Sequence, residues 1–161
     1  EAEFVDEGLP EGSKGAIRSV AKSGAEGEFR QIAPPTAWNM GQFVVYEDSQ
    51  LHVRFKVERR GYFSIFLMTH VHDPNREDVG LYQYFEEELW AKESQWREVT
   101  IPLSKFSRKS QETRKFVEGG PEAAEVAWQV FFSGANSDLI LVIDEIWVDQ
   151  TGTGEVEFVD L

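Results

Sequence analysis

The sequence predicts an all-β fold in which two antiparallel sheets pack face to face as a β-sandwich. Turn-forming residues recur at short intervals, among them Gly8-Leu9-Pro10, Asp73-Pro74-Asn75 and Gly119-Gly120-Pro121. Between these turns lie short β-rich runs, several of which alternate their side chains with a period of two. Many short strands separated by turns favour a sandwich over alternating strands and helices.

Nine strands are expected, near residues 15–21, 28–33, 42–47, 50–58, 62–70, 80–86, 96–102, 126–132 and 139–148. The alternation is clearest in 50–58, where one face carries Leu51, Val53, Phe55 and Val57 and the other carries His52, Arg54 and Lys56. The run at 62–70 is apolar on both faces, which is typical of a central strand.

Two segments are harder to assign. Phe85–Gln95 holds fair helix formers such as Glu87 and Ala91, so a short helix competes with a strand that runs through Leu81–Phe85 into a turn. We favour the strand for its first half. Lys105–Glu125 is polar and contains two Gly and one Pro, which predicts a long connection with at most one helical turn.

Composition restricts the classes of function. The 161 residues suit one soluble domain, and no apolar run approaches the roughly 18 residues of a membrane-spanning helix. A net charge of −13 argues against nucleic acid and anionic membranes, whose phosphates require clustered Lys and Arg. The absence of Cys excludes disulfides, thiolate metal sites and a cysteine nucleophile.

The terminal tetrapeptide Glu1-Ala2-Glu3-Phe4 has the letters of a processed secretion leader followed by a cloning site. We therefore expect residues 1–4 to be an expression scar and residues 5–161 to form a single β-sandwich domain. A natural acidic terminus is the alternative.

Two segments near the C-terminal end carry a resemblance to a known family. These are WREVTIPLSKF at Trp96–Phe106 and DLILVIDEIWV at Asp138–Val148. They resemble the closing strands of the β-sandwich carbohydrate-binding modules attached to secreted glycoside hydrolases and lyases, in which a Trp-rich strand runs into "iPls-F" and the chain closes on "l-iD-i-v". The resemblance implies a jelly roll that binds a polysaccharide or oligosaccharide without catalysis, as a secreted, monomeric module of a larger protein. The acidic charge favours a neutral glycan.

Aromatic side chains are the first candidates for glycan contact, because sugar rings present C–H faces that pack on aromatic planes. Tyr82 and Tyr84 share one strand face and have polar neighbours, whereas Trp38 follows Pro34-Pro35 in an expected loop. Core or edge packing is the alternative for each. The aromatic candidates are Trp38, Tyr46, Tyr82, Tyr84 and Trp90. Trp96 and Trp128 lie in strong strand patterns, and we expect them to pack between the sheets.

Polar residues could complete such a site. His52 and Arg54 belong to the polar stripe of 50–58, which would offer donors to sugar hydroxyls on a concave sheet and would be solvated surface on a convex one. Gln129 lies in an apolar strand and needs a hydrogen-bond partner, for which a bound sugar is one possibility.

The resemblance also implies one structural Ca²⁺ that ties the N-terminal segment to the last strand. Asp6 and Glu7 occupy the early acidic position and Asp144 the "iD-i" position, which would supply oxygen ligands for a hard cation. An Asp in an apolar strand is costly to bury unless it is paired or coordinated. The alternative is that Asp144 bonds a neighbouring turn or faces solvent.

Two other classes of function stay open. There is no G-x-S-x-G elbow, but the 29 acidic residues could form a glycosidase pair anywhere in the fold. Jelly-roll polysaccharide lyases use a His–Tyr–Arg–Gln constellation, which Gln50-Leu51-His52 matches only faintly. A structural or interaction domain that binds no sugar is the third possibility, and its mark would be aromatic rings buried between the sheets.

Overall fold

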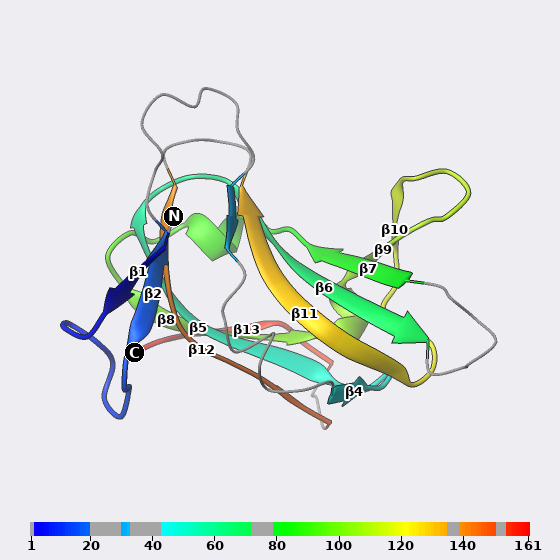
Figure 1. Ribbon diagram of the computed structural model, residues 1–161, viewed down its shortest axis with the longest axis horizontal. Helices are drawn as coiled ribbons and strands as arrows, with labels where there is room; N and C mark the ends of the chain where they lie inside the picture. The colour runs from blue at the N-terminus through cyan, green and yellow to red at the C-terminus, as the bar shows by residue number, and fades with distance from the viewer. Residues whose placement is uncertain (1, 20–29, 33–42, 72–78, 135–138, 151–153) are drawn as a thin grey trace.

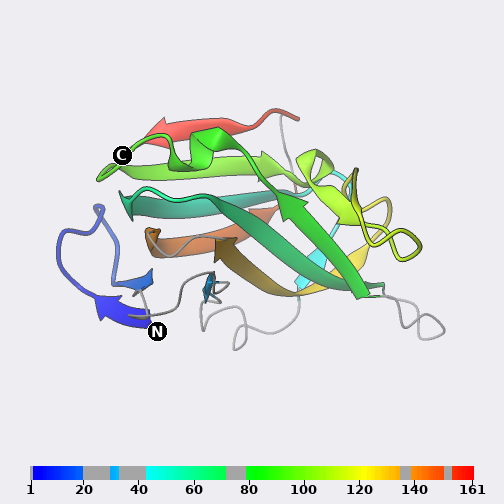
Figure 2. The same ribbon diagram turned by 90° about the horizontal axis from the view of Figure 1, so that it is seen from above.

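The computed structural model describes residues 2–19, 30–32, 43–71, 79–134, 139–150 and 154–161. They form two antiparallel sheets that pack face to face, which confirms the predicted all-β sandwich (Figure 1). The first sheet has the order β1 (Ala2–Val5), β2 (Ala16–Ser19), β12 (Ile140–Asp149), β5 (Gln50–Arg59), β8 (Trp96–Pro102) and β13 (Glu157–Asp160). Figure 2 shows β13, β8, β5 and β12 side by side.

The second sheet has the order β10 (Phe116–Glu118), β9 (Ser107–Lys109), β7 (Val79–Tyr84), β6 (Phe63–Val71), β11 (Glu125–Gly134) and β3 (Arg30–Ile32), with β4 (Phe43–Val45) also paired to β11. Strand β6 lies between β7 and β11, so the strand predicted to be central is central. The jelly-roll connectivity stays a prediction. No helix among the described residues is long and apolar enough to span a membrane.

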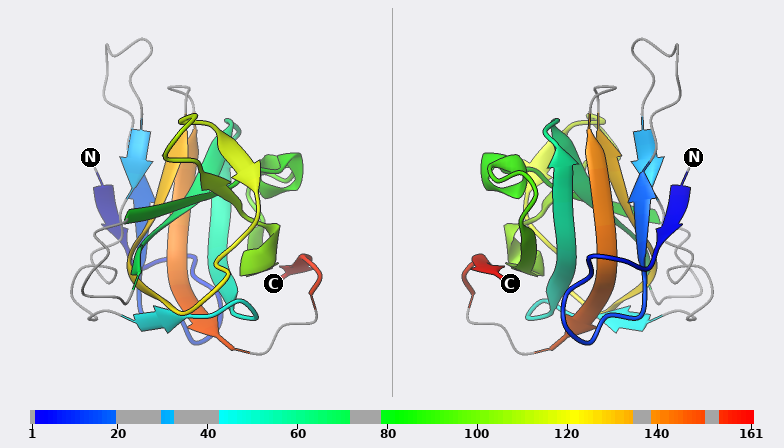
Figure 3. Two further views of the ribbon diagram at one scale, coloured as in Figure 1. Left: turned by 90° about the vertical axis from the view of Figure 1, so that its right-hand side faces the viewer. Right: turned by 90° about the vertical axis from the view of Figure 1, so that its left-hand side faces the viewer.

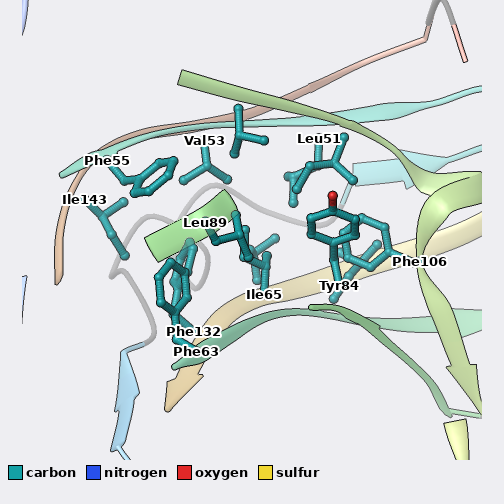
Figure 4. Close-up of a cluster of buried hydrophobic side chains, with 14 of the residues drawn as sticks. Leu51, Val53, Phe55, Phe63, Ile65, Tyr84, Leu89, Phe106, Phe132 and Ile143 are labelled. Atoms are coloured by element: carbon teal, nitrogen blue, oxygen red, sulfur yellow. The ribbon is translucent and has the colours of Figure 1, made fainter. Parts of the chain in front are cut away.

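The core lies between the inner faces of the two sheets, as Figure 4 shows. Leu51, Val53 and Phe55 of β5 point inward, as their alternation predicts, and each is at most 2% exposed. Phe63 and Ile65 of β6 face them from the second sheet. Burying such side chains provides the main driving force for folding, at about 25 cal/mol per Å² of apolar surface.

The structure contains all nine predicted strands and adds four short ones, β1, β9, β10 and β13. The prediction for Lys105–Glu125 was incomplete, because this segment contains the β9–β10 hairpin. The strand predicted through Leu81–Phe85 ends at Tyr84, and a short 3-10 helix follows at Glu87–Trp90. A second 3-10 helix spans Leu103–Lys105. Most of the predicted terminal scar lies in β1, which pairs with β2 at the sheet edge.

A buried arginine joins the last strand to the first of these 3-10 helices. Arg97 on β8 is 2% exposed and donates to the Glu88 carbonyl and carboxylate, at 2.7 Å each. It also donates to Asp160 of β13 at 3.2 Å, and its guanidinium lies 4.6 Å from the centroid of the Phe158 ring. These contacts fix the position of the 3-10 helix that carries Trp90.

Candidate functional site

A groove of about 350 Å³ opens on the side of the second sheet that faces away from the core. It lies where the first residues of β6 meet the last residues of β7 and β11. Its lining residues are either aromatic or polar and uncharged, and they are Tyr62, Phe63, Ser64, Phe66, Gln83, Phe85 and Ser133. None of these seven side chains is charged.

Two exposed rings form the walls of the groove. Tyr62 immediately precedes β6 and Phe85 immediately follows β7, and each is 59% exposed. The antiparallel register, in which Ile65 pairs with Tyr84, brings these two strand ends together. Trp90, only 4% exposed, contacts both rings, with centroid distances of 5.3 Å to Tyr62 and 5.0 Å to Phe85. The buried indole therefore holds the two walls in place.

The floor of the groove is uncharged and combines polar groups with one aromatic ring. The Gln83 amide donates to the Ser64 hydroxyl at 2.8 Å, which fixes the orientation of the amide. Ser133 on β11 pairs directly opposite Ser64 on β6. Phe66 continues the floor and stacks on Phe131 at 4.7 Å between centroids. Aromatic walls above neutral hydrogen-bonding groups suit a ligand with apolar faces and uncharged hydroxyls.

The structure corrects the predicted exposure of Tyr82 and Tyr84, which are 0% and 7% exposed. Both point into the core, and carboxyl groups satisfy their hydroxyls. Tyr82 donates to Glu125 at 2.5 Å, and Tyr84 donates to Glu86. Burial, together with these hydrogen bonds, raises the pKa of both phenols. Their polar sequence neighbours misled the prediction, because Gln83 between them faces the opposite side of the strand.

Trp90 was also predicted as a surface contact and is buried instead, because it packs behind Tyr62 and Phe85. Tyr46 is 39% exposed but lies away from the groove. It lines a separate acidic hollow of about 630 Å³ with Glu47, Asp48 and Glu122. Trp38 lies outside the described residues.

His52 and Arg54 lie on the outer face of the first sheet, not in the groove. The His52 ring stacks on Trp147 at 4.8 Å between centroids, and its two nitrogens contact Asp149 and Thr100 at 2.9 Å. Arg54 lies within 3.2–3.6 Å of the carboxylates of Glu98, Asp144 and Glu145. The side chains of this stripe are therefore already paired with other groups of the protein.

The loop between β1 and β2, residues 6–15, crosses the outer face of the first sheet (Figure 3, right view). The Gly8 carbonyl accepts a hydrogen bond of 2.7 Å from the Trp96 indole on β8, and Ser13 donates to Asp144 on β12. Trp96 therefore lies outside the sandwich, contrary to its predicted place between the sheets, because Arg97 and Val99 take the inner positions. We call residues 6–15 the β1–β2 loop.

Gln129 faces away from the core on the second sheet, opposite Met68, and is 8% exposed. It shares the outer face with the groove but does not line it. Its neighbour Trp128 lies at a register shift in β11 and stacks on His70 at 5.5 Å between centroids, so it too is not packed between the sheets.

The residues predicted to bind Ca²⁺ do not form a cation site. Both Asp144 oxygens have protein partners, Ser13 for Oδ1 and Arg54, at 3.5 Å, for Oδ2. Asp6 and Glu7 are exposed in the β1–β2 loop. Within the described ranges, no three acidic or histidine side chains gather closely enough to hold a metal ion. These residues therefore do not fit the Ca²⁺ that the family resemblance implies.

The walls of the groove, Tyr62 and Phe85, were not among the residues predicted from the sequence. Tyr62 follows Gly61 at the start of an apolar run, and Phe85 ends the run LYQYF before three glutamates. The position of an aromatic residue at a strand end beside a turn is the sequence pattern that could have indicated both residues. Their proximity depends on the β6–β7 register, which a single sequence does not specify.

Comparison of the chain with protein-family models, with curated protein sequences and with solved structures finds no match. The candidate site therefore rests on the chemistry of its own residues.

Proposed function

We propose that this protein binds a neutral polysaccharide or oligosaccharide in the groove of the second sheet, without catalysing a reaction on it. The observation that carries the proposal is the pair of exposed rings, Tyr62 and Phe85, above a floor of uncharged hydroxyl and amide groups. Sugars combine apolar C–H faces with hydroxyl groups at their rims, so they complement both features. The family resemblance of the closing strands points the same way.

We propose binding without catalysis because the lining of the groove contains no acidic or basic side chain except the Tyr62 phenol. The residues that resemble a lyase motif do not line the groove: Gln50 and His52 lie on β5 of the first sheet, and Tyr82 is buried in the core. A role as a secreted module that brings an attached enzyme to its substrate extends this proposal.

Affinity electrophoresis tests the proposal. The protein is run through native gels that contain a soluble β-glucan, xylan, mannan or polyuronate, and retention by a neutral polymer is the expected result. Tyr62→Ala and Phe85→Ala should each weaken retention about tenfold, because each removes one stacking surface. Intrinsic fluorescence in urea checks that both variants still fold.

Tyr46→Ala is the matched control, since it also removes an exposed ring. Strand β4, which ends just before Tyr46, pairs with Glu125 of β11. Glu125 is eight positions from Ser133, so Tyr46 lies beside a point about 26 Å along β11 from the groove. Loss of retention in this variant but not in Tyr62→Ala would move the site to the acidic hollow. Release of reducing or unsaturated ends from any polymer would replace binding with catalysis.

A further inference from the structure

Ser133 is buried at the groove with its hydroxyl unsatisfied. The residue is 5% exposed, and its Oγ has no hydrogen-bond partner among the described residues. Buried hydroxyls are nearly always paired, because an unpaired one has lost its water without gaining a replacement. An exception of this kind in the floor of a groove requires an explanation.

Ser64 provides an internal comparison. It faces Ser133 across the β6–β11 pair and is equally buried, at 5% exposed. Its hydroxyl accepts the hydrogen bond from the Gln83 amide at 2.8 Å. The two serines therefore share their environment and differ in that one hydroxyl is occupied by the protein and the other is not.

We infer that the Ser133 hydroxyl binds a hydroxyl group of the sugar that lies in the groove, and so determines which sugars the groove accepts. A serine hydroxyl can donate one hydrogen bond and accept two, and it rotates about a single bond to meet its partner. A sugar hydroxyl likewise donates and accepts, so the two groups are complementary without any charge. This inference rests on the proposed function, and it assigns the sugar specificity of the groove to one atom, the Ser133 Oγ.

The test compares Ser133→Ala with Ser64→Ala. The neutral polysaccharide that retains the wild type most strongly is titrated calorimetrically into the wild type and both variants, and each melting temperature is measured without ligand. Ser133→Ala should weaken binding about five- to tenfold, the effect of one lost hydrogen bond, and leave the melting temperature unchanged or slightly raised. Ser64→Ala should lower the melting temperature, because it leaves the Gln83 amide without its acceptor.

Each other outcome is decisive. Unchanged affinity in Ser133→Ala would overturn the inference while leaving the proposed function intact. A fall in melting temperature larger than that of Ser64→Ala would also overturn it, since the hydroxyl would then have a structural role. Failure of every polysaccharide in the panel to bind the wild type would overturn the proposed function, and the inference with it.

Discussion

The Trp90 indole lies edge-to-face against the Tyr62 ring, with 5.3 Å between centroids and 86° between the planes. On another side it contacts Phe85 at 5.0 Å. The 3-10 helix that carries Trp90 is held by Arg97, which bonds the Glu88 carbonyl at 2.7 Å. The groove walls are thus supported by a buried ring and, behind it, by a buried cation.

Trp90→Ala should lower the free energy of unfolding by about 3–5 kcal/mol, because it leaves a large cavity behind both walls. Trp90→Phe should cost less and should retain part of the glycan affinity. Urea unfolding followed by circular dichroism measures both. Trp147→Ala, on the half-buried outer face of the first sheet, is the control. An equal cost for Trp90→Ala and Trp147→Ala would contradict the supporting role.

Tyr82→Phe should destabilise the fold by about 1.5–3 kcal/mol, since the buried carboxyl of Glu125 loses one of its two hydroxyl donors. Thr69, at 2.6 Å, would remain as the other donor. Tyr84→Phe is the matched control and should cost less, because its partner Glu86 is exposed and can bond water instead. Chemical denaturation of the two variants gives the comparison, and the reverse order would argue against a buried polar cluster.

The Arg18–Glu58 pair should make stability depend on pH. Arg18 donates two hydrogen bonds of 2.8 Å to Glu58, and these bonds lower the pKa of that carboxyl below its ordinary 4.5, with Lys56 contributing. A lowered pKa stabilises the folded state above the unfolded value, and this stabilisation is lost as the pH falls through the folded value. Glu58→Gln should therefore lower the melting temperature at neutral pH, with a difference that shrinks as the pH falls below 4.5.

The exposed Glu11 serves as the control for this pH experiment, since its substitution by Gln should shift the melting temperature little at any pH. A constant difference between wild type and Glu58→Gln across the acid range would show that the pair is not responsible.

A chelation experiment tests the predicted Ca²⁺. Because Ser13 and Arg54 already satisfy Asp144, we expect excess chelator to leave the melting temperature unchanged and elemental analysis to find no bound calcium. Asp144→Asn should lower the melting temperature with or without chelator, since Arg54 loses one of its anionic partners. A clear drop on chelation alone would instead establish an ion bound by the folded state.

Glycan binding should depend weakly on salt, because no charged side chain lines the groove. Retention of the best neutral polymer is measured at low and at physiological ionic strength. A collapse of affinity with added salt would indicate a charged ligand and would return attention to Arg54 and Lys56.

The strands with clean alternation could be predicted from the sequence. The period of two predicted the inward positions of Leu51, Val53 and Phe55, and the apolar residues on both faces of β6 predicted its central place in the sheet. The added strands β1, β9, β10 and β13 are about as short as the predicted β3 and β4, but they lie in segments that were interpreted as a polar connection or as a chain end. Their pairing comes from register with neighbouring strands.

The groove was harder to predict because exposure depends on partners distant in sequence. The Tyr82 hydroxyl is buried against Glu125, which is 43 positions away in the sequence. The residues next to Tyr82 therefore do not predict this contact. Similarly, Tyr62 and Phe85 become neighbours only through the β6–β7 register. The family resemblance directed attention to aromatic residues in general, but it could not distinguish a wall from a support such as Trp90.

The β1–β2 loop makes the two broad faces of the sandwich unequal. It covers part of the first sheet through Trp96 and Asp144, whereas the groove opens on the second sheet. A domain bound to an insoluble polymer through the groove would therefore turn this loop toward solvent. Since the chain contains no Cys, Glu11→Cys would create a unique thiol there for a fluorophore, on the side away from the ligand. Such a label would report where the protein binds and in which orientation, without blocking the groove.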